Sequence, residues 1–358
     1  MIRGVLVYGT IVWGALVCTA CRSSVKVGLG VSGPENAKLV LLVSNEASDD
    51  ISFIDGVSDS VLRSLPVGKR PRGLRVSQDG RKLYVALSGS PRGGPNVDES
   101  TLPPPDRTSD GIGVVDLASA ALQTKFSSGN DPETIDSSPD GRMLAVANED
   151  SAQVRLIDAE SGAVVATVPV GLEPEGLRFR PDGRVVYVTS ESSDRIDVID
   201  VGAHRVIATI ATGKRPRNVL FSPTGDRAYV TCEFAGRIDV IDAQQHRTIN
   251  TVEIEGTPKA MPMGLALDDS QDRLYVSLGR AGEVALIDTR ALRLLQRIGN
   301  LGARPWGIAL SPDGDKLYTA NGPSGDVSVI DTRSLQVLRR IPVGKQPWGL
   351  SFARVRGT

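Results

Sequence analysis

The chain has 358 residues, enough for one large domain or two ordinary ones with a sizeable core. Its 41 basic and 42 acidic side chains leave a net charge of −1, which excludes the strong excess of one sign that nucleic-acid and membrane-surface proteins carry. Aromatic residues make up only 4%, whereas 38 glycines and 22 prolines favour many short strands and turns over long packed helices.

The first 21 residues differ in composition from the rest. Arg3 precedes an apolar run over residues 4–17, and the small-residue segment "CTAC" follows at 18–21. This is the order of a secretory signal. The cysteine at the cut resembles a bacterial lipoprotein signal, which implies that Cys21 is lipidated and becomes the mature N-terminus. The alternative is an uncleaved N-terminal anchor, although the run is shorter than the about 20 residues of a bilayer span. Both interpretations predict export to the periplasm or cell envelope.

A repeat runs through the remainder of the chain. An apolar residue followed by aspartate closes a strand-like segment seven times, at Asp55, Asp116, Asp158, Asp200, Asp242, Asp288 and Asp331. The spacings are 61, 42, 42, 42, 46 and 43 residues. The first exceeds 42 by 19, and a Pro/Gly/Ser-rich insertion at 89–110 accounts for the excess. The insertion also explains why "KRPR" at 69–72 returns at 214–217. The pattern predicts seven equivalent units and one insertion.

Each unit has the signature of four short strands. In residues 175–213, apolar and polar residues alternate over segments of four to six, which is the strand period and not the helical one. Turns such as "SPDG" and "RPDG" join the first two strands, because proline presets φ and glycine accepts positive φ. Four antiparallel strands per 42 residues or so is the size of a β-propeller blade.

The ends of the repeat predict how the ring closes. The first unit begins at 37–46 with the counterpart of a second strand, and its missing first strand is matched by "PWGLSFARV" at 347–355. We therefore expect an all-β, seven-bladed propeller over 37–358, closed by a C-terminal strand that completes the first blade. Residues 22–36 are expected to form a linker. Closure of this kind protects sheet edges.

The segments "YVALS", "YVTSE", "YVTCE", "YVSLG" and "YTANG", each after a tight turn, resemble the YVTN repeat. The chain from about 37 to 354 is similar to YVTN-type, YncE-like seven-bladed propellers. The resemblance implies an exported bacterial propeller, and it does not imply one activity. The Gly-His and Trp-Asp signatures of WD40 repeats are missing.

Candidate ligand-binding residues follow from the expected topology. If the first strand of each blade is innermost, the residue after each connector proline points to the mouth of the central channel. These residues include Arg72, Glu133, Glu175, Arg217, Trp306 and Trp348, with Met263 in the sixth blade. The position just past the second strand adds Glu46, Glu149, Glu191 and Glu233. We expect a polar mouth partly covered by the 89–110 insertion. The alternative is a set of solvated loop ends that form weak pairs.

Residues for familiar catalytic chemistry are scarce. His204 and His246 each follow an Ile-Asp dipeptide by four residues, which marks them as turn residues. The sequence has no cluster of His or Cys residues that could bind zinc, copper or haem. It also lacks the nucleophile-elbow, P-loop and Rossmann motifs. No catalytic residue and no cofactor are assigned. A divalent cation on carboxylates remains an alternative, with Asp98, Glu99, Asp106 and Asp110 of the insertion as calcium candidates.

Three functions stay open on the sequence. The first is a lipid-tethered binding scaffold, a monomer that holds a protein, peptide or small molecule at the channel mouth. The second is a propeller hydrolase or lactonase with a carboxylate-bound divalent ion. The third, by family analogy, is an accessory protein of a periplasmic quinone-dependent redox system. Nucleic acid is not an expected partner, and the membrane is expected to be reached only through the N-terminal anchor.

Overall fold

The computed structural model describes Met1 and residues 37–93, 98–256 and 259–356. Apart from Met1, the expected signal segment with Cys21 and the expected linker 22–36 lie outside the described residues. Within the described ranges, no helix is long and apolar enough to cross a bilayer.

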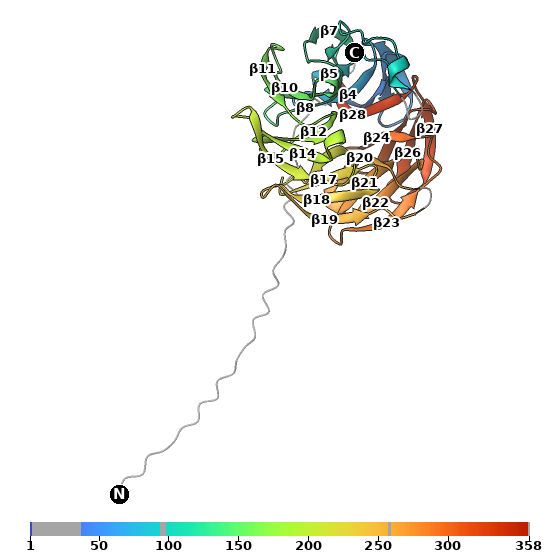
Figure 1. Cartoon of the computed structure of the whole chain (residues 1–358). Coiled ribbons are helices and arrows are strands. Elements are labelled where there is room, and N and C mark those ends of the chain that lie inside the picture. Colours follow the sequence, from blue (N-terminus) through green and yellow to red (C-terminus); the bar gives the residue numbers. More distant parts are fainter. Residues whose placement is uncertain (2–36, 94–97, 257–258, 357–358) are drawn as a thin grey trace. The chain divides into compact units, whose positions relative to one another are not determined.

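Seven four-stranded antiparallel sheets stand around a common centre as blades (Figure 1). Blade 1 contains, from the centre outward, β28 (Pro347–Arg356), β1 (Ala37–Asn45), β2 (Asp50–Asp55) and β3 (Val61–Pro66). Blade 2 contains β4 (Pro71–Val76), β5 (Lys82–Leu87), β6 (Gly111–Asp116) and β7 (Ala121–Phe126). Blade 3 contains β8 (Pro132–Ser137), β9 (Met143–Asn148), β10 (Gln153–Asp158) and β11 (Val164–Pro169). Blade 4 contains β12 (Pro174–Phe179), β13 (Val185–Ser190), β14 (Arg195–Asp200) and β15 (Arg205–Ala211).

The remaining blades follow the same order. Blade 5 contains β16 (Pro216–Phe221), β17 (Arg227–Cys232), β18 (Arg237–Asp242) and β19 (Arg247–Glu253). Blade 6 contains β20 (Pro262–Asp268), β21 (Arg273–Leu278), β22 (Glu283–Asp288) and β23 (Arg293–Ile298). Blade 7 contains β24 (Pro305–Leu310), β25 (Lys316–Asn321), β26 (Asp326–Asp331) and β27 (Val337–Pro342). Single 3₁₀ turns η1 (Glu99–Thr101), η2 (Glu149–Ser151), η3 (Glu191–Ser193) and η4 (Asp269–Gln271) complete the elements of the described residues.

The predicted closure of the ring is confirmed. β28 pairs with β1 from Ala37 opposite Arg356 to Asn45 opposite Pro347, so the C-terminal strand supplies the innermost strand of blade 1. The backbone N–H of Gly349 also donates to Ser44 Oγ at 2.8 Å, and this hydroxyl donates to the Arg72 carbonyl of blade 2 at 2.7 Å. The closing strand is therefore tied both to its own sheet and to the next blade.

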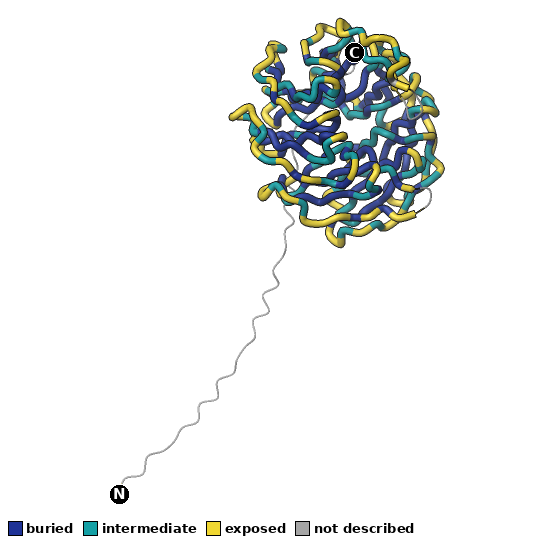
Figure 2. Tube along the Cα trace, in the orientation of Figure 1, coloured by how far each residue is buried: buried dark blue, intermediate teal, exposed yellow. Residues whose placement is uncertain are grey.

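The hydrophobic core consists of layers between neighbouring blades, not of one central cluster. Seven separate clusters of buried apolar side chains each join two adjacent blades. One of them packs Leu41 and Val43 of blade 1 against Tyr318 and Val327 of blade 7, which closes the circle by packing as well. Figure 2 shows burial concentrated in the middle strands and exposure at the turns and outer strands. Since the core lies between blades, the centre is left free for a channel.

The aspartate that recurs in every blade has a structural role in the turn that follows it. Each of the seven accepts backbone N–H bonds in the turn that it begins, as Asp55 does from Val57 and Ser58 at 3.0 and 2.8 Å. The two histidines are also turn residues, with φ of 54° at His204 and 51° at His246. His246 Nδ1 lies 2.7 Å from the Tyr187 hydroxyl. Burial lowers the pKa of this imidazole.

Candidate functional site at the channel mouth

The width of the channel is set by glycines that let neighbouring inner strands approach. Two residues after the connector proline, five of the seven blades carry glycine: Gly73, Gly176, Gly264, Gly307 and Gly349. A Cβ on Gly307 would lie only 2.2 Å from the Trp348 carbonyl oxygen, and one on Gly176 only 2.4 Å from that of Arg217. Any side chain here would push the inner strands apart. The glycines thus bring the residues beside them into one small space.

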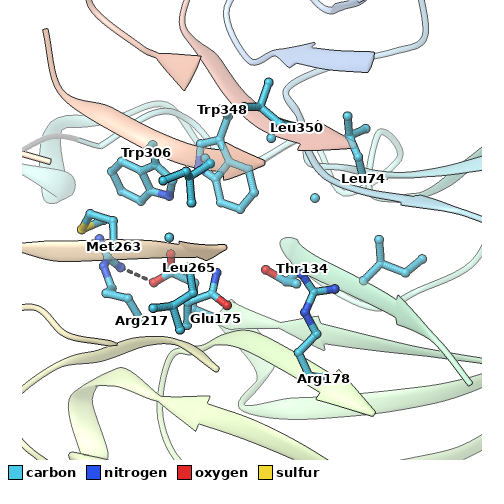
Figure 3. A pocket seen from close by; sticks show the side chains of 17 residues that line it. Leu74, Thr134, Glu175, Arg178, Arg217, Met263, Leu265, Trp306, Trp348 and Leu350 are labelled. Atoms are coloured by element: carbon cyan, nitrogen blue, oxygen red, sulfur yellow. Dashed lines mark hydrogen bonds and ion pairs between the residues drawn. The ribbon is translucent and has the colours of Figure 1, made fainter. Parts of the chain in front are cut away.

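The residue just after each connector proline stands at this constriction. A cavity of about 80 Å³ is lined by five of these residues, namely Glu175, Arg217, Met263, Trp306 and Trp348. Arg72 and Glu133 are buried at the same level, and their chain neighbours Gly73 and Thr134 line the cavity. Figure 3 shows Trp306 and Trp348 on one side of the cavity, with Glu175 and Arg178 on the other.

The four glutamates past the second strands are placed by one repeated backbone hydrogen bond. In each case the glutamate N–H donates to the carbonyl of the residue before the connector proline of the same blade. The bonds are Glu46 to Gln346, Glu149 to Asp131, Glu191 to Glu173 and Glu233 to Arg215, at 2.9, 3.0, 3.0 and 2.9 Å. Because this bond joins two loops on the mouth face, each glutamate side chain begins beside the connector of its own blade.

Arg217 gathers three of these carboxylates around one guanidinium. It contacts Glu175 and Glu191 directly, and its Nε lies 2.9 Å from Oε2 of Glu233. Arg215 binds the outer side of the same group, with Nε 2.8 Å from Glu191 and 3.1 Å from Glu233. All three glutamates are buried. Two arginines and three glutamates of blades 4 and 5 thus form one network, which we call the Arg217 cluster.

A second network, the Arg72 cluster, joins blades 1, 2 and 3. Arg72 contacts Asp131 and Glu133 directly and lies 3.8 Å from Glu149. Arg70 adds two more links, with Nε 2.7 Å from Glu46 and Nη1 3.7 Å from Asp131. The glutamates that the sequence singles out are therefore brought to the mouth, but they divide between two arginine centres and do not form one ring.

Burial and charge act in opposite directions on these carboxyl groups. Burial, together with the neighbouring charges of Asp131 and Glu175, raises the pKa of Glu149 to about 7, and Arg72 only partly offsets this. Burial likewise raises the pKa of Glu175 in spite of Arg217. For Asp131 burial also works upward, but Arg72 and Arg70 outweigh it and leave the pKa below its usual value. Burial thus brings the pKa of Glu149 close to neutral pH.

Oxygen atoms of Asp131, Glu133 and Glu149 lie within 4.8 Å of one another, a spacing that a divalent ion can bridge. However, Arg72 already contacts the first two and lies near the third. The local geometry satisfies the carboxylates with a guanidinium, so an ion would have to displace Arg72. Asp106 of the insertion is likewise paired, with Lys69 at 2.7 Å, and Asp110 with Arg107 at 3.2 Å.

The opposite wall of the channel is aromatic and apolar. The Trp306 and Trp348 ring centres are 6.1 Å apart with a 32° tilt. The guanidiniums of Arg217 and Arg304 each lie 5.0 Å from the centre of the Trp306 ring, within cation–π range. Side chains of Leu265, Ile308 and Leu350 extend this wall below the tryptophans. At the cavity, the channel thus has a charged half, with Glu175, Arg178 and Arg217 of blades 4 and 5, and an aromatic half, with Trp306 and Trp348 of blades 7 and 1.

The insertion between β5 and β6 is attached to the rim of the mouth. Arg107 binds Asp150 of blade 3 at 2.5 Å, and Arg70 donates to the Ser90 carbonyl at 3.2 Å. A separate cavity of about 270 Å³ lies between the insertion and blade 1, lined by Glu46, Asp49, Lys69, Arg70 and residues 88–92. The described part of the insertion is therefore attached to the blade 1 to blade 3 side of the mouth.

Sequence reasoning missed Arg70, Asp131 and Arg215, which hold the two clusters together. They occupy the position before the connector proline, where φ is positive at 48°, 52° and 58°. This backbone turns the side chain back toward the mouth. When the seven units are aligned with one another, "KRP", "NDP" and "KRP" place charged residues at the same repeat position. This pattern could have identified the three residues.

Comparisons with known proteins agree with the fold. Residues 176–333 match the family model described as "Lactonase, 7-bladed beta-propeller", a stretch that is less than half of the chain. An antigen, Lp49, of Leptospira interrogans is 28% identical over 126 residues, which are 35% of this chain and 26% of that protein. The chain thus matches about a quarter of the length of this curated relative.

Solved structures with the same fold include enzymes of different chemistry. The periplasmic gluconolactonase of Pseudomonas aeruginosa has a TM-score of 0.70 at 24% identity, over 88% of this chain and 99% of that one. A putative 6-phosphogluconolactonase of Bacteroides fragilis has 0.72 at 17%, over 88% and 98%. Hydrazine synthase of Kuenenia stuttgartiensis has 0.69 at 22%, over 82% and 92%. At these identities the likeness establishes the seven-bladed fold and leaves the activity to be argued from the site.

Proposed function

We propose that the protein is a binding propeller that holds a small ligand at the mouth of its central channel. The observation that carries this proposal is the cavity lined together by Glu175, Arg217, Trp306 and Trp348. An aromatic platform facing fixed charged groups is the usual composition of a small-molecule site. The residue types differ from blade to blade at this level, whereas structural positions of the repeat keep one type throughout.

The state of the carboxylates favours binding over metal-assisted catalysis. The Arg72 cluster and the Arg217 cluster are each organised around arginine side chains, which offset part of the negative charge of their carboxylates. Such networks fix the position of each oxygen atom, which suits hydrogen bonding to a polar ligand.

The test is a thermal-shift screen of the full chain against neutral sugars, sugar acids, amines and short peptides. A ligand of the mouth should raise the melting temperature of the wild type and fail to do so with Trp348→Ala. Val57→Ala is the control, because Val57 is 80% exposed in a turn outside the mouth. Hits that Trp348→Ala leaves unchanged would refute binding at the mouth.

Lactone hydrolysis is the second candidate. It is supported by the family model over residues 176–333 and by Glu149, whose pKa of about 7 suits a general base. In this reaction Glu149 would take a proton from water as the water oxygen attacks the lactone carbonyl. The ring C–O bond then breaks, and the ring oxygen leaves as an alkoxide that takes the proton back from Glu149 and becomes a hydroxyl. The product is a hydroxy acid.

Hydrolysis of gluconolactone above its spontaneous rate tests this candidate. Wild-type activity that falls by about a hundredfold or more in Glu149→Gln would support it, since general bases contribute about 10²–10⁴-fold. A rate equal to that of buffer in both proteins removes it. Export and a lipid anchor at Cys21 belong to the proposal as well, and they rest on the signal-like composition of residues 1–21.

A further inference from the structure

A second charged level lies inside the channel, below the mouth. Four residues after the connector proline, three neighbouring inner strands carry Arg75 on β4, Asp136 on β8 and Arg178 on β12. The same position in the other four blades holds Leu220, Ala266, Ala309 and Ser351, which are uncharged. Charge at this level is therefore confined to one side of the channel, under the Arg72 cluster and Glu175.

Two guanidiniums share one carboxylate at this level. Arg75 Nε lies 2.8 Å and Arg178 Nη1 3.4 Å from the same Oδ1 atom of Asp136. The other oxygen, Oδ2, accepts the Phe179 backbone N–H at 2.9 Å. Both oxygens of Asp136 are thus engaged, and the side chain is only 3% exposed. In the described part of the chain no other carboxylate lies within ion-pair distance of Arg75 or Arg178.

With two guanidiniums and one carboxylate, this level carries a local excess of positive charge, although Glu175 lines the same cavity. Arg178 lines the central cavity and remains 30% exposed to it, while its Nε atom is buried without a hydrogen-bond partner. Burial lowers the pKa of Arg178, and the charge of Arg75 adds to this effect despite Asp136. A buried donor without a partner is costly, and a charged donor more so. An anion placed here would meet both needs.

We propose that the channel binds a small carboxylate, with its charged group on Arg178, which lines the cavity, while Arg75 shares Asp136 and so leaves positive charge on Arg178. The planar guanidinium matches a carboxylate in shape and in hydrogen-bond direction. Leu74, Leu350 and Trp348 line the same cavity, and Figure 3 shows Arg178 rising toward the space below them. They give the hydrocarbon end of the ligand an apolar surface on the side of the mouth. This inference deepens the proposed function by naming the class of ligand, and it rests on the same channel.

The smallest ligand that combines a carboxylate with a hydrocarbon end is an acid of a few carbon atoms, and the cavity of about 80 Å³ beside Arg178 has room for it. Propionate is therefore a suitable probe, and propionamide is its neutral counterpart of the same shape.

The experiment is calorimetric titration of the full chain with propionate at pH 7 and constant ionic strength. We expect saturable binding of propionate to the wild type and none of propionamide. Arg178→Gln should weaken binding by about tenfold to a hundredfold, the usual effect of losing a charged hydrogen bond. This variant keeps Asp136 paired with Arg75 and should fold, and Arg75→Gln provides the second test. Arg81→Gln is the control, because its side chain is 78% exposed.

The outcomes separate this inference from the proposed function. Equal binding of propionate and propionamide, equal binding by wild type and Arg178→Gln, or no saturable propionate binding up to about 10 mM would each overturn the carboxylate site. If ligands from the thermal-shift screen nevertheless stabilise the wild type and not Trp348→Ala, the proposal of binding at the mouth is supported and the anion site is not. If propionate depends on Arg178 while no ligand responds to Trp348→Ala, the anion site stands and the mouth proposal falls.

Discussion

The Arg217 guanidinium lies 5.0 Å from the centre of the Trp306 ring while it contacts the Glu191 carboxylate on blade 4. One side chain of blade 5 thus joins the charged half of the channel to its aromatic half. Because this guanidinium also binds Glu175 and Glu233, the shape of the mouth depends on it more than on any single carboxylate.

Replacing Arg217 with methionine should therefore destabilise the protein strongly. The change keeps much of the side-chain volume but removes the ion pair of Glu175 and leaves Glu191 and Glu233 paired with Arg215 alone. Loss of one partner of a buried ion pair costs about 3–5 kcal/mol. Denaturant unfolding of wild type and Arg217→Met measures the difference. The matched control is Arg81→Met, at a side chain that is 78% exposed. If both variants unfold at the same denaturant midpoint as the wild type, the Arg217 cluster does not contribute to the stability of the fold.

Gly307→Ala tests the close approach of the inner strands. The new Cβ would lie 2.2 Å from the Trp348 carbonyl oxygen, so β24 and β28 would have to separate. We expect a loss of about 1–3 kcal/mol, as for other overpacked sites. Gly299→Ala is the control, since nothing lies within 4 Å of a Cβ at Gly299 and its φ is not positive. Thermal unfolding of both variants gives the comparison. A larger loss for Gly299→Ala would contradict the packing explanation.

The raised pKa of Glu149 predicts a pH effect with a definite sign. Between its ordinary pKa of 4.5 and about 7, the folded protein holds a proton that the unfolded chain releases. Stability should therefore fall as the pH rises through this window. Glu149→Gln removes the effect. The melting temperature of this variant, relative to that of the wild type, should therefore be higher at pH 8 than at pH 5, which is roughly the window set by the two pKa values. A difference that does not change with pH would show that Glu149 titrates normally.

Divalent cations should leave the melting temperature unchanged. Arg72 and Arg217 already occupy the centres of the two carboxylate groups, and a cation would have to displace a guanidinium. Addition of Ca²⁺ or Mg²⁺ to the wild type, and to the triple variant Glu149→Gln, Glu191→Gln, Glu233→Gln, measures this. A rise in the wild type alone would favour a metal site at the mouth instead.

The N-terminal segment predicts a membrane anchor. Cleavage before Cys21 and lipidation of its thiol would place the protein in the membrane fraction of the producing cell. Cys21→Ser should move it to the soluble fraction. Because Cys232 is buried, Cys232→Ser is a control that removes a thiol without touching the signal. Partitioning that is the same for all three proteins would refute lipidation.

The repeat predicted the architecture because each unit carries its own turns and its own strand period. The register of Asp55 to Asp331 gave the number of blades, and the displaced strand at 347–355 gave the closure, which β28 confirms. The position of the mouth followed from the same register, so Glu175, Arg217, Trp306 and Trp348 could be placed in advance.

The pairing within the mouth could not be predicted in this way. A repeat assigns each residue to a blade and a level, but the reach of an arginine between blades depends on side-chain rotamers and on the local backbone. Arg217 binds glutamates of blades 4 and 5, and Arg70 reaches back to Glu46 of blade 1. The deeper level of Arg75 and Arg178 was missed for a simpler reason, since only the position next to the proline was considered.

The seam between Ser44 and Gly349 joins residues that are 305 positions apart. β1 has no inner neighbour during the interval before β28, at the other end of the chain, becomes available. During that interval the strand presents an open edge, and an unpaired edge invites association with other chains. Premature collapse of the early blades would also trap the circle in an open form. Closing the ring therefore depends on contacts between the two ends of the chain, the kind of contact that makes folding slow.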